Sequence, residues 1–263
     1  MSSLKRYGTT ALVTGASSGI GKSYARAIAK DGLNLVLVAR RKALLDELAE
    51  ELSGEHGIQV HTIAQDLTDM DAADKVHENV QQAGLEIDIL VNNAGFGSHG
   101  VFDELSLERE LEMINLSCRL PVALTHKFMG AMKQRNRGAI VFLSSMAGTM
   151  PIPFMSTYSA TKAFPLFLAE SLYGELAETN IDVVAVAPGD TSTEFRETAD
   201  LDNKFPIPPR SADDVVQTTF NALGKKPSVI DGAANKISAF AMARLPKKML
   251  IKNNAKLWAV TKD

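Results

Sequence analysis

Short apolar runs recur along the chain, separated by longer stretches in which apolar and polar residues follow a helical spacing. Most of these runs are almost continuous in Val, Ile and Leu, whereas a strand with one solvent-exposed face alternates between apolar and polar side chains. A continuous run is typical of a strand buried on both faces, as in a parallel sheet. The pattern predicts strands at residues 9–15, 33–39, 59–65, 87–93, 138–144 and 181–187.

The stretches between these runs predict helices. One example is KALLDELAEEL at residues 42–52, and the longest helical stretches cover 106–135 and 155–178. Strands that alternate with helices predict right-handed crossovers and a doubly wound α/β sheet with helices on both faces. No repeat or low-complexity linker divides the chain, so residues 1–263 are expected to form a single domain. Ligands of such sheets bind at the carboxyl ends of the strands.

Composition narrows the function classes. The 263 residues are 45% hydrophobic and 22% charged, as in an ordinary globular protein, and the net charge of −3 argues against nucleic acid as a partner. Cys118 is the one cysteine, so no internal disulfide can form and no Cys/His cluster suggests a metal site. The N-terminal residues contain no long apolar run, and we expect no signal peptide, no membrane span and a cytoplasmic setting.

A glycine-rich turn follows the first predicted strand. In TGASSGIG, Gly15, Gly19 and Gly21 are spaced G-x3-G-x-G directly before a helical stretch. Glycine lets backbone amides approach a ligand, and a helix N-terminus offers unpaired N–H groups and the positive end of its dipole. The turn is therefore predicted to bind a pyrophosphate, although a tight turn without a ligand has the same residues.

This turn resembles the coenzyme turn of the classical short-chain dehydrogenase/reductase family. The resemblance covers roughly residues 8–195, in the family's order and spacing. It continues through Asp66, NNAG at 92–95, Asn115, the serine pair 144–145, YSATK at 158–162 and Pro188–Gly189. It implies a Rossmann fold and an enzyme that interconverts a carbonyl and a secondary alcohol by hydride transfer with a nicotinamide coenzyme.

The predicted catalytic pair is Tyr158 and Lys162, which lie four residues apart and so share one helix face. A free phenol has a pKa of about 10, and we expect the nearby ammonium to lower it. Tyr158 would then exchange a proton with the substrate oxygen, while Lys162 also bonds the coenzyme ribose. The resemblance gives Ser145 the role of orienting that oxygen, Ser144 being one residue out of register. The resemblance also implies that Asn115 holds a water that links Lys162 to solvent. Alternatively, an asparagine inside a helix can bend the helix backbone without such a role.

The resemblance also implies which residues bind the coenzyme. They are Gly15, Ser17, Ser18, Gly19, Ile20, Gly21, Arg40, Asp66, Leu67, Asn93, Ala94, Gly95, Tyr158, Lys162, Pro188, Gly189, Thr191 and Thr193. Ala39 stands where an acidic residue would select NAD, and Arg40 and Arg41 follow it. An arginine can hold a 2′-phosphate, so NADP(H) is favoured over NAD(H). Arg40 is the first choice, since Arg41 can equally be a solvated helix start, and Ser17 could add a hydroxyl.

Proline interrupts the helix that carries the catalytic pair. Pro165 has no N–H to donate to the carbonyl of Thr161. We expect a kink at this point, compensated by a polar group or a water.

The substrate side is predicted from two segments. A polar, proline-rich stretch at 190–210 has the place of the family's substrate lid, with Phe195 and Phe205 as apolar contacts. The C-terminal extension, 228–263, is predicted to be mostly helical and broken near Pro246. Its basic and apolar residues could lie on an anionic membrane, but we expect the extension to pack near the substrate entrance without stable membrane anchoring.

The resulting hypothesis is an NADP(H)-dependent oxidoreductase for an apolar or bulky carbonyl substrate. The helical stretches 106–135 and 155–178 have more apolar residues than packing on one face of the sheet requires. Together with the resemblance, this excess predicts a homodimer or homotetramer. Two alternatives stay open. A nucleotide-sensing regulatory protein on the same fold typically lacks the tyrosine or the lysine, and both are present here. A sugar-nucleotide-modifying relative tends to have a longer chain and another glycine spacing.

Overall fold

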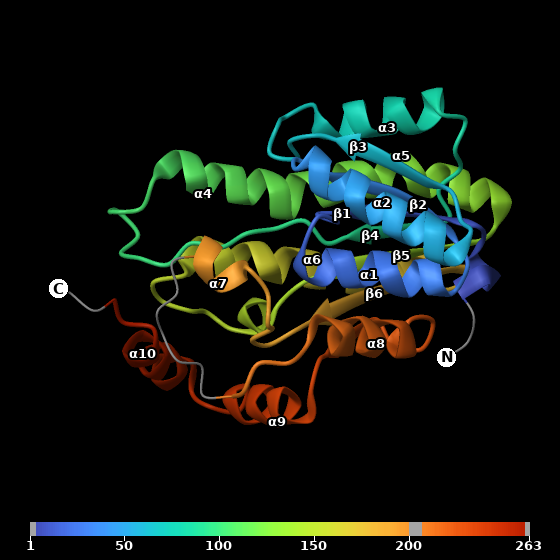
Figure 1. The fold of residues 1–263 in the computed structure, drawn as a ribbon. Helices are drawn as coiled ribbons and strands as arrows, with labels where there is room; N and C mark the ends of the chain where they lie inside the picture. The colour runs from blue at the N-terminus through green and yellow to red at the C-terminus, as the bar shows by residue number, and fades with distance from the viewer. Residues whose placement is uncertain (1–3, 200–206, 261–263) are drawn as a thin grey trace.

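The strands form one parallel sheet in the order β3-β2-β1-β4-β5-β6-β7 (Figure 1). The computed structural model describes residues 4–199 and 207–260. The sheet confirms the predicted doubly wound fold, and its direction of growth reverses between β1 and β4, where a ligand site is expected. The strands are β1 (Thr10–Thr14), β2 (Asn34–Ala39), β3 (Val60–Ala64), β4 (Ile89–Asn92), β5 (Gly138–Leu143), β6 (Ile181–Ala187) and β7 (Ser228–Ile230).

Both faces of the sheet are buried, which explains the continuous apolar runs. In β2, Leu35 and Leu37 belong to the hydrophobic cluster on one face, and Val36 and Val38 belong to the cluster on the other. Because successive side chains of a strand point to opposite faces, each central strand must be apolar at almost every position.

Helices cover the two faces in layers. Helices α1 (Gly19–Lys30), α2 (Lys42–His56) and α8 (Ala212–Ala222) contribute to one cluster, and α3 (Ala72–Gln82), α5 (Leu120–Arg135) and α6 (Ser156–Glu175) contribute to the other. In α2 the buried positions are Leu45, Leu48 and Leu52, which form an apolar stripe on an otherwise polar helix. Short 3₁₀ turns at Leu4–Tyr7 and Met146–Thr149, helix α4 (Leu107–Ile114) and helix α7 (Phe195–Thr198) complete the body.

The C-terminal extension differs from the prediction at its start. It opens with β7, whose three residues pair in parallel with β6, and so it adds a strand to the sheet. Helices α9 (Ala233–Met242) and α10 (Lys247–Leu257) follow, and the break between them at Pro246 confirms the predicted one. In Figure 1 these two helices lie below the sheet, with α9 at the bottom of the view and α10 to its left.

The long helix predicted at 106–135 is not continuous. A π-helical turn, Asn115–Arg119, separates α4 from α5. The helix predicted at 155–178 is present as α6 and runs through Pro165. The carbonyl of Thr161, which the proline leaves without its helical donor, accepts a hydrogen bond from the Cys118 thiol at 3.9 Å. A side chain of the π-helical turn is therefore the polar group that compensates for Pro165.

Candidate active site

The glycine turn joins β1 to α1 and leaves the start of that helix open. Gly15 and Gly19 have positive φ angles, 67° and 52°, which favour glycine. A Cβ on Gly21 would lie 2.1 Å from the carbonyl oxygen of Gly15, so the close approach of turn and helix requires glycine there. The N-cap residue, Ser18, makes no side-chain capping bond, and the first N–H groups of α1 are left for a ligand.

A cavity of about 520 Å³ lies at the carboxyl ends of the strands. It is lined by every predicted site residue except Asn115. These residues are Gly15, Ser17, Ser18, Gly19, Ile20, Gly21, Arg40, Asp66, Leu67, Asn93, Ala94, Gly95, Ser145, Tyr158, Lys162, Pro188, Gly189, Thr191 and Thr193.

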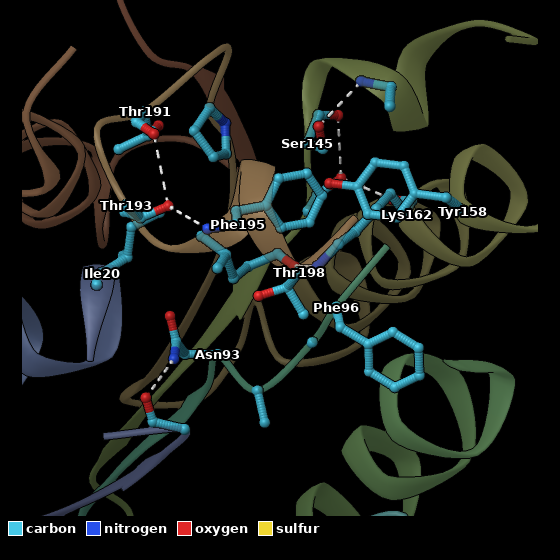
Figure 2. A pocket seen from close by; sticks show the side chains of 18 of the residues that line it. Ile20, Asn93, Phe96, Ser145, Tyr158, Lys162, Thr191, Thr193, Phe195 and Thr198 are labelled. Carbon is cyan, nitrogen blue, oxygen red and sulfur yellow. Dashed lines mark hydrogen bonds between the residues drawn. The ribbon is translucent and has the colours of Figure 1, made fainter. Parts of the chain in front are cut away.

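The tyrosine, the lysine and the serine come together at one end of the cavity (Figure 2). Tyr158 and Lys162 are buried neighbours on α6, and the lysine Nζ lies 6.0 Å from the centre of the phenol ring. The Ser145 hydroxyl hydrogen-bonds to the Tyr158 hydroxyl and accepts the Ala147 N–H at 3.1 Å. Lys162 donates to the Leu143 carbonyl at 3.1 Å. A substrate carbonyl placed between Ser145 and Tyr158 would meet two hydroxyl groups.

Burial is the main cause of the shifted pKa values of Tyr158 and Lys162. Burial raises the pKa of Tyr158 to about 12, partly opposed by the hydrogen bond with Ser145, and burial lowers the pKa of Lys162 to about 8. The expectation that the ammonium lowers the phenol pKa was therefore wrong for this structure, because desolvation outweighs it and Lys162 turns towards the Leu143 carbonyl. At neutral pH the phenol holds its proton and most of the lysine is charged, so Tyr158 is set up as a proton donor.

Asn115 does not line the cavity. It opens the π-helical turn, and its main-chain carbonyl accepts the Leu120 N–H across the wider turn. This agrees with the alternative of a helix-bending asparagine, and its predicted contact with a water stays a prediction.

Two arginines lie at the far end of the cavity, beyond the glycine turn. Arg40 is 72% exposed and lies 3.7 Å from Asp66. Arg41, which could have been a solvated helix start, donates to the Ser17 hydroxyl at 3.2 and 3.3 Å and pairs with Glu194 at 3.2 Å. Arg40 was the first choice for the phosphate-binding arginine, but the structure brings Arg41 to the same end of the cavity. The sequence signal that pointed to Arg41 was its place directly after Arg40 at the end of the second strand.

Asn93 shows that the cavity fits a dinucleotide. Its amide nitrogen donates to the Thr14 carbonyl at 2.8 Å, while its side-chain oxygen is buried and has no hydrogen-bond partner within the described residues. A buried acceptor beside a cavity fits the hydroxyl or amine donors of a nucleoside. Together with the open start of α1, this fits a nicotinamide dinucleotide. Among residues 4–199 and 207–260, no His, Cys, Asp or Glu cluster could hold a metal ion.

The end of the cavity that holds Tyr158 is largely apolar. Met150, Ile152, Met155 and Phe195 line it, and the Phe195 ring lies 5.3 Å from the Tyr158 ring (Figure 2). Phe195 lines the cavity, and its predicted contact with substrate stays a prediction, whereas Phe205 lies outside the described residues.

Residues of the C-terminal extension line the same end of the cavity, and their place at a substrate entrance stays a prediction. Met242, Leu257 and Trp258 line the cavity. His99 hydrogen-bonds to the Trp258 carbonyl at 2.8 Å, and Asn254 donates to the Pro151 carbonyl at 2.9 Å. No sequence signal pointed to these individual contacts. Within the described part of the chain, no helix has the length and apolar character needed to span a membrane.

Comparison with known proteins agrees with this site. A model of the short chain dehydrogenase family matches residues 9–204. The chain therefore belongs to the short chain dehydrogenase family and is an oxidoreductase. The family's coenzyme is a nicotinamide dinucleotide and its substrates are small molecules.

Individual relatives cover nearly the whole chain. The 7beta-hydroxysteroid dehydrogenase of Clostridium sardiniense is 31% identical over 233 residues, 88% of each chain. A structure from a study of 7beta-hydroxysteroid dehydrogenase stereoselectivity has a TM-score of 0.88 at 28% identity and covers 97% of this chain and 100% of that one. A short-chain dehydrogenase from Sphingobium yanoikuyae in complex with NADPH has a TM-score of 0.78 at 35% identity, covering 90% and 93%. The bulky-bulky ketone specific alcohol dehydrogenase from Comamonas testosteroni has a TM-score of 0.75 at 32% identity, covering 91% and 95%.

Proposed function

We propose that this protein is an NADPH-dependent reductase of bulky, apolar ketones. The observation that carries the proposal is the buried, protonated Tyr158, bonded to Ser145 at the end of a cavity with an apolar wall. The names of the relatives, a hydroxysteroid dehydrogenase and a bulky ketone specific alcohol dehydrogenase, support the substrate class. The predicted single domain for residues 1–263 is part of this proposal.

The chain's own residues would perform the acid chemistry. A bound nicotinamide dinucleotide supplies the hydride that adds to the carbonyl carbon. Ser145 donates a hydrogen bond that orients and polarises the carbonyl oxygen. Tyr158 gives its proton to that oxygen as negative charge develops there, so that the product is the alcohol. Lys162 keeps positive charge beside the phenol and stabilises the phenolate that remains.

NADP(H) is the proposed coenzyme. Position 39 carries an alanine rather than a carboxylate, and Arg40, Arg41 and Ser17 surround the end of the cavity where a 2′-phosphate would lie. The complex of the Sphingobium yanoikuyae enzyme with NADPH supports this choice. Because cells usually keep NADP reduced, the reductive direction is part of the proposal.

The test is consumption of NADPH with a panel of carbonyl compounds. We expect turnover with steroid ketones or bulky aromatic ketones and much slower turnover with a small ketone such as acetone, which leaves the apolar wall unfilled. NADPH binding without turnover on any ketone, aldehyde or acyl thioester would contradict the proposal and support a nucleotide-sensing role. Turnover of sugar nucleotides alone would support the other alternative.

A homodimer or homotetramer is the proposed assembly. Exposed apolar side chains gather on α4, α5 and α6, among them Leu111, Val122, Phe164 and Phe167, the last of which is 67% exposed. We expect light scattering at micromolar concentration to give a mass at least twice that of the 28.4 kDa chain. Phe167→Glu should shift the mass towards the monomer. A 28 kDa species for the unmodified protein contradicts this expectation.

The last helix of the extension should affect substrate more than coenzyme. A cut before β7 would remove a sheet strand, so the informative truncation follows Met242 and removes α10. Loss of Leu257 and Trp258 opens the apolar wall, and burial of apolar area is worth about 25 cal/mol per Å². We expect KM for a bulky ketone to rise roughly tenfold or more, since about 1.4 kcal/mol corresponds to tenfold.

The binding constant for NADPH is the internal control for this truncation and should change less than about twofold, because α10 lies on the substrate side. An unchanged KM would contradict the role of α10. Strong sedimentation of the full chain with anionic liposomes at physiological salt would overturn the expectation of no stable membrane anchoring.

A cytoplasmic setting completes the proposal. Cys118 is the one cysteine, and its half-buried thiol bonds to the Thr161 carbonyl, so a reducing compartment suits it. Fractionation of cells that express the full chain tests this.

A further inference from the structure

Glu194 is an acidic residue at the end of the cavity where the proposed coenzyme would bring negative charge. Its carboxylate pairs with the Arg41 guanidinium at 3.2 Å, although the two residues are 153 positions apart in the chain. Both side chains line the cavity, as does Ser17, whose hydroxyl accepts hydrogen bonds from Arg41. The guanidinium is thus bonded to an anion that belongs to the chain itself.

The main chain around Glu194 is fixed against the glycine turn. A Cβ added to Gly19 would lie 3.2 Å from the Thr193 Cγ2, so this threonine touches the turn. The Thr193 hydroxyl accepts the Phe195 N–H at 3.3 Å (Figure 2), and the Glu194 carbonyl accepts the Thr198 N–H at 3.1 Å. These contacts keep the Glu194 carboxylate at the coenzyme end of the cavity.

A carboxylate and a phosphate compete for the same side of Arg41. A planar guanidinium forms paired hydrogen bonds with either anion. The Arg41 and Glu194 side chains are 46% and 58% exposed, and an exposed ion pair contributes little free energy. A phosphate, which carries more charge than a carboxylate, can therefore displace Glu194. A 2′-hydroxyl is uncharged and does not compete in this way.

Displacement leaves the Glu194 carboxylate without a cation. Within the described parts of the chain, Arg41 is its one ion-pair partner. The neighbouring Arg196 is bonded to Asp190, to which its Nε donates at 3.1 Å. A bound 2′-phosphate would therefore lie near an unpaired carboxylate of the same charge, and the repulsion between them weakens its binding.

We propose that Glu194 is a coenzyme-specificity residue, whose carboxylate occupies Arg41 in the coenzyme-free protein and has to yield it to the 2′-phosphate of NADP(H). This inference rests on the proposed function. The two residues have opposite effects, because Arg41 favours the phosphorylated coenzyme and Glu194 narrows the margin over NAD(H). Glu194 acts through Arg41 and is a positioning residue.

The first test measures binding of two adenosine ligands that contain no nicotinamide. Adenosine 2′,5′-bisphosphate carries the 2′-phosphate, whereas adenosine 5′-phosphate has a hydroxyl in its place. Glu194→Gln should tighten binding of the bisphosphate roughly three- to tenfold, because it removes both the pair with Arg41 and a negative charge beside the phosphate. Binding of adenosine 5′-phosphate should change less than about twofold. Isothermal titration calorimetry measures both affinities.

Glu197→Gln is the matched control. Glu197 belongs to the same short helix, is exposed and does not line the cavity. The control removes the same charge, so a general effect of net charge on phosphate binding would appear in both variants. We expect both affinities to stay within about twofold in Glu197→Gln, since solvent and salt screen a charge at this position. An equal gain in the two variants would overturn the proposal.

A double-mutant cycle separates competition for Arg41 from a structural role of Glu194. In the Arg41→Ala background, Glu194→Gln should lose most of its effect on the bisphosphate, because no guanidinium remains to be released. The thermal midpoint of Glu194→Gln should stay close to that of the unmodified protein, since an exposed pair stabilises the fold little. A gain in affinity that persists undiminished without Arg41 would overturn the competition.

Failure of this inference can be distinguished from failure of the proposed function. If the unmodified protein and Glu194→Gln prefer the bisphosphate to the same extent, Glu194 does not compete and the inference alone fails. If neither protein prefers the bisphosphate, Arg41 holds no 2′-phosphate, and the proposed coenzyme fails together with the inference. Absence of ketone turnover concerns the proposed function alone, because these binding measurements involve no substrate.

Discussion

Tyr158→Phe is expected to lower kcat for ketone reduction by roughly 10²- to 10⁴-fold, the range that general acid catalysis contributes. Phenylalanine keeps the ring that packs against Phe195, so the cavity keeps its shape. It removes only the hydroxyl, and with it the proton that the product oxygen needs. The NADPH binding constant should stay within about fivefold, because a neutral hydroxyl bond contributes about 1 kcal/mol. Steady-state kinetics and calorimetry make these two measurements.

Tyr24→Phe is the matched control for this prediction. Tyr24 is fully buried, and its hydroxyl lies 2.7 Å from the Thr219 hydroxyl, away from the cavity residues. Its loss should cost stability, about 1 kcal/mol, and leave kcat unchanged. If Tyr158→Phe turned over ketone at the unmodified rate, the assignment of Tyr158 as the acid would be wrong.

The sheet was predictable because burial on both faces leaves a strong signal. The predicted ranges contain β1 to β6, since a central strand such as β2 must be apolar at nearly every position. Strand β7 was missed because three half-buried residues, Ser228–Ile230, carry no pattern that separates them from a loop. The π-helical turn was missed for a related reason. One additional residue per turn leaves the local composition unchanged, and only the packing of α4, α5 and α6 determines where it falls.

The candidate site was predictable as far as its motifs reach along the chain. The glycine turn, Ser145, Tyr158 and Lys162 line one cavity because each follows a strand or lies on the helix beside it. Contacts made by distant segments were not predictable. Trp258 reaches the cavity through the path of α10, and the pKa values depend on burial that no local pattern contains.

Coenzyme preference depends on the charges that follow β2. Arg41 is held towards the glycine turn by its bonds to Ser17, whereas Arg40 is mostly exposed and lies 3.7 Å from Asp66. A bound 2′-phosphate would accept charge-assisted hydrogen bonds from the two arginines in place of their contacts with Ser17 and Asp66. Each such bond is worth about 1.5–3 kcal/mol. Arg41→Ala and Arg40→Ala should each weaken NADPH binding roughly 10- to 100-fold. Binding of NADH, which lacks that phosphate, should change little.

Adding Ala39→Asp to these two changes should reverse the preference towards NADH. The new carboxylate would repel a 2′-phosphate and accept a hydrogen bond from a 2′-hydroxyl. Arg26→Ala is the matched control, because Arg26 pairs with Glu51 at 2.8 Å and does not line the cavity, and it should leave both coenzyme affinities unchanged. Calorimetry with NADPH and NADH measures all of these affinities. If the unmodified protein bound NADH more tightly than NADPH, the two arginines would have no phosphate to hold and the proposed coenzyme would be wrong.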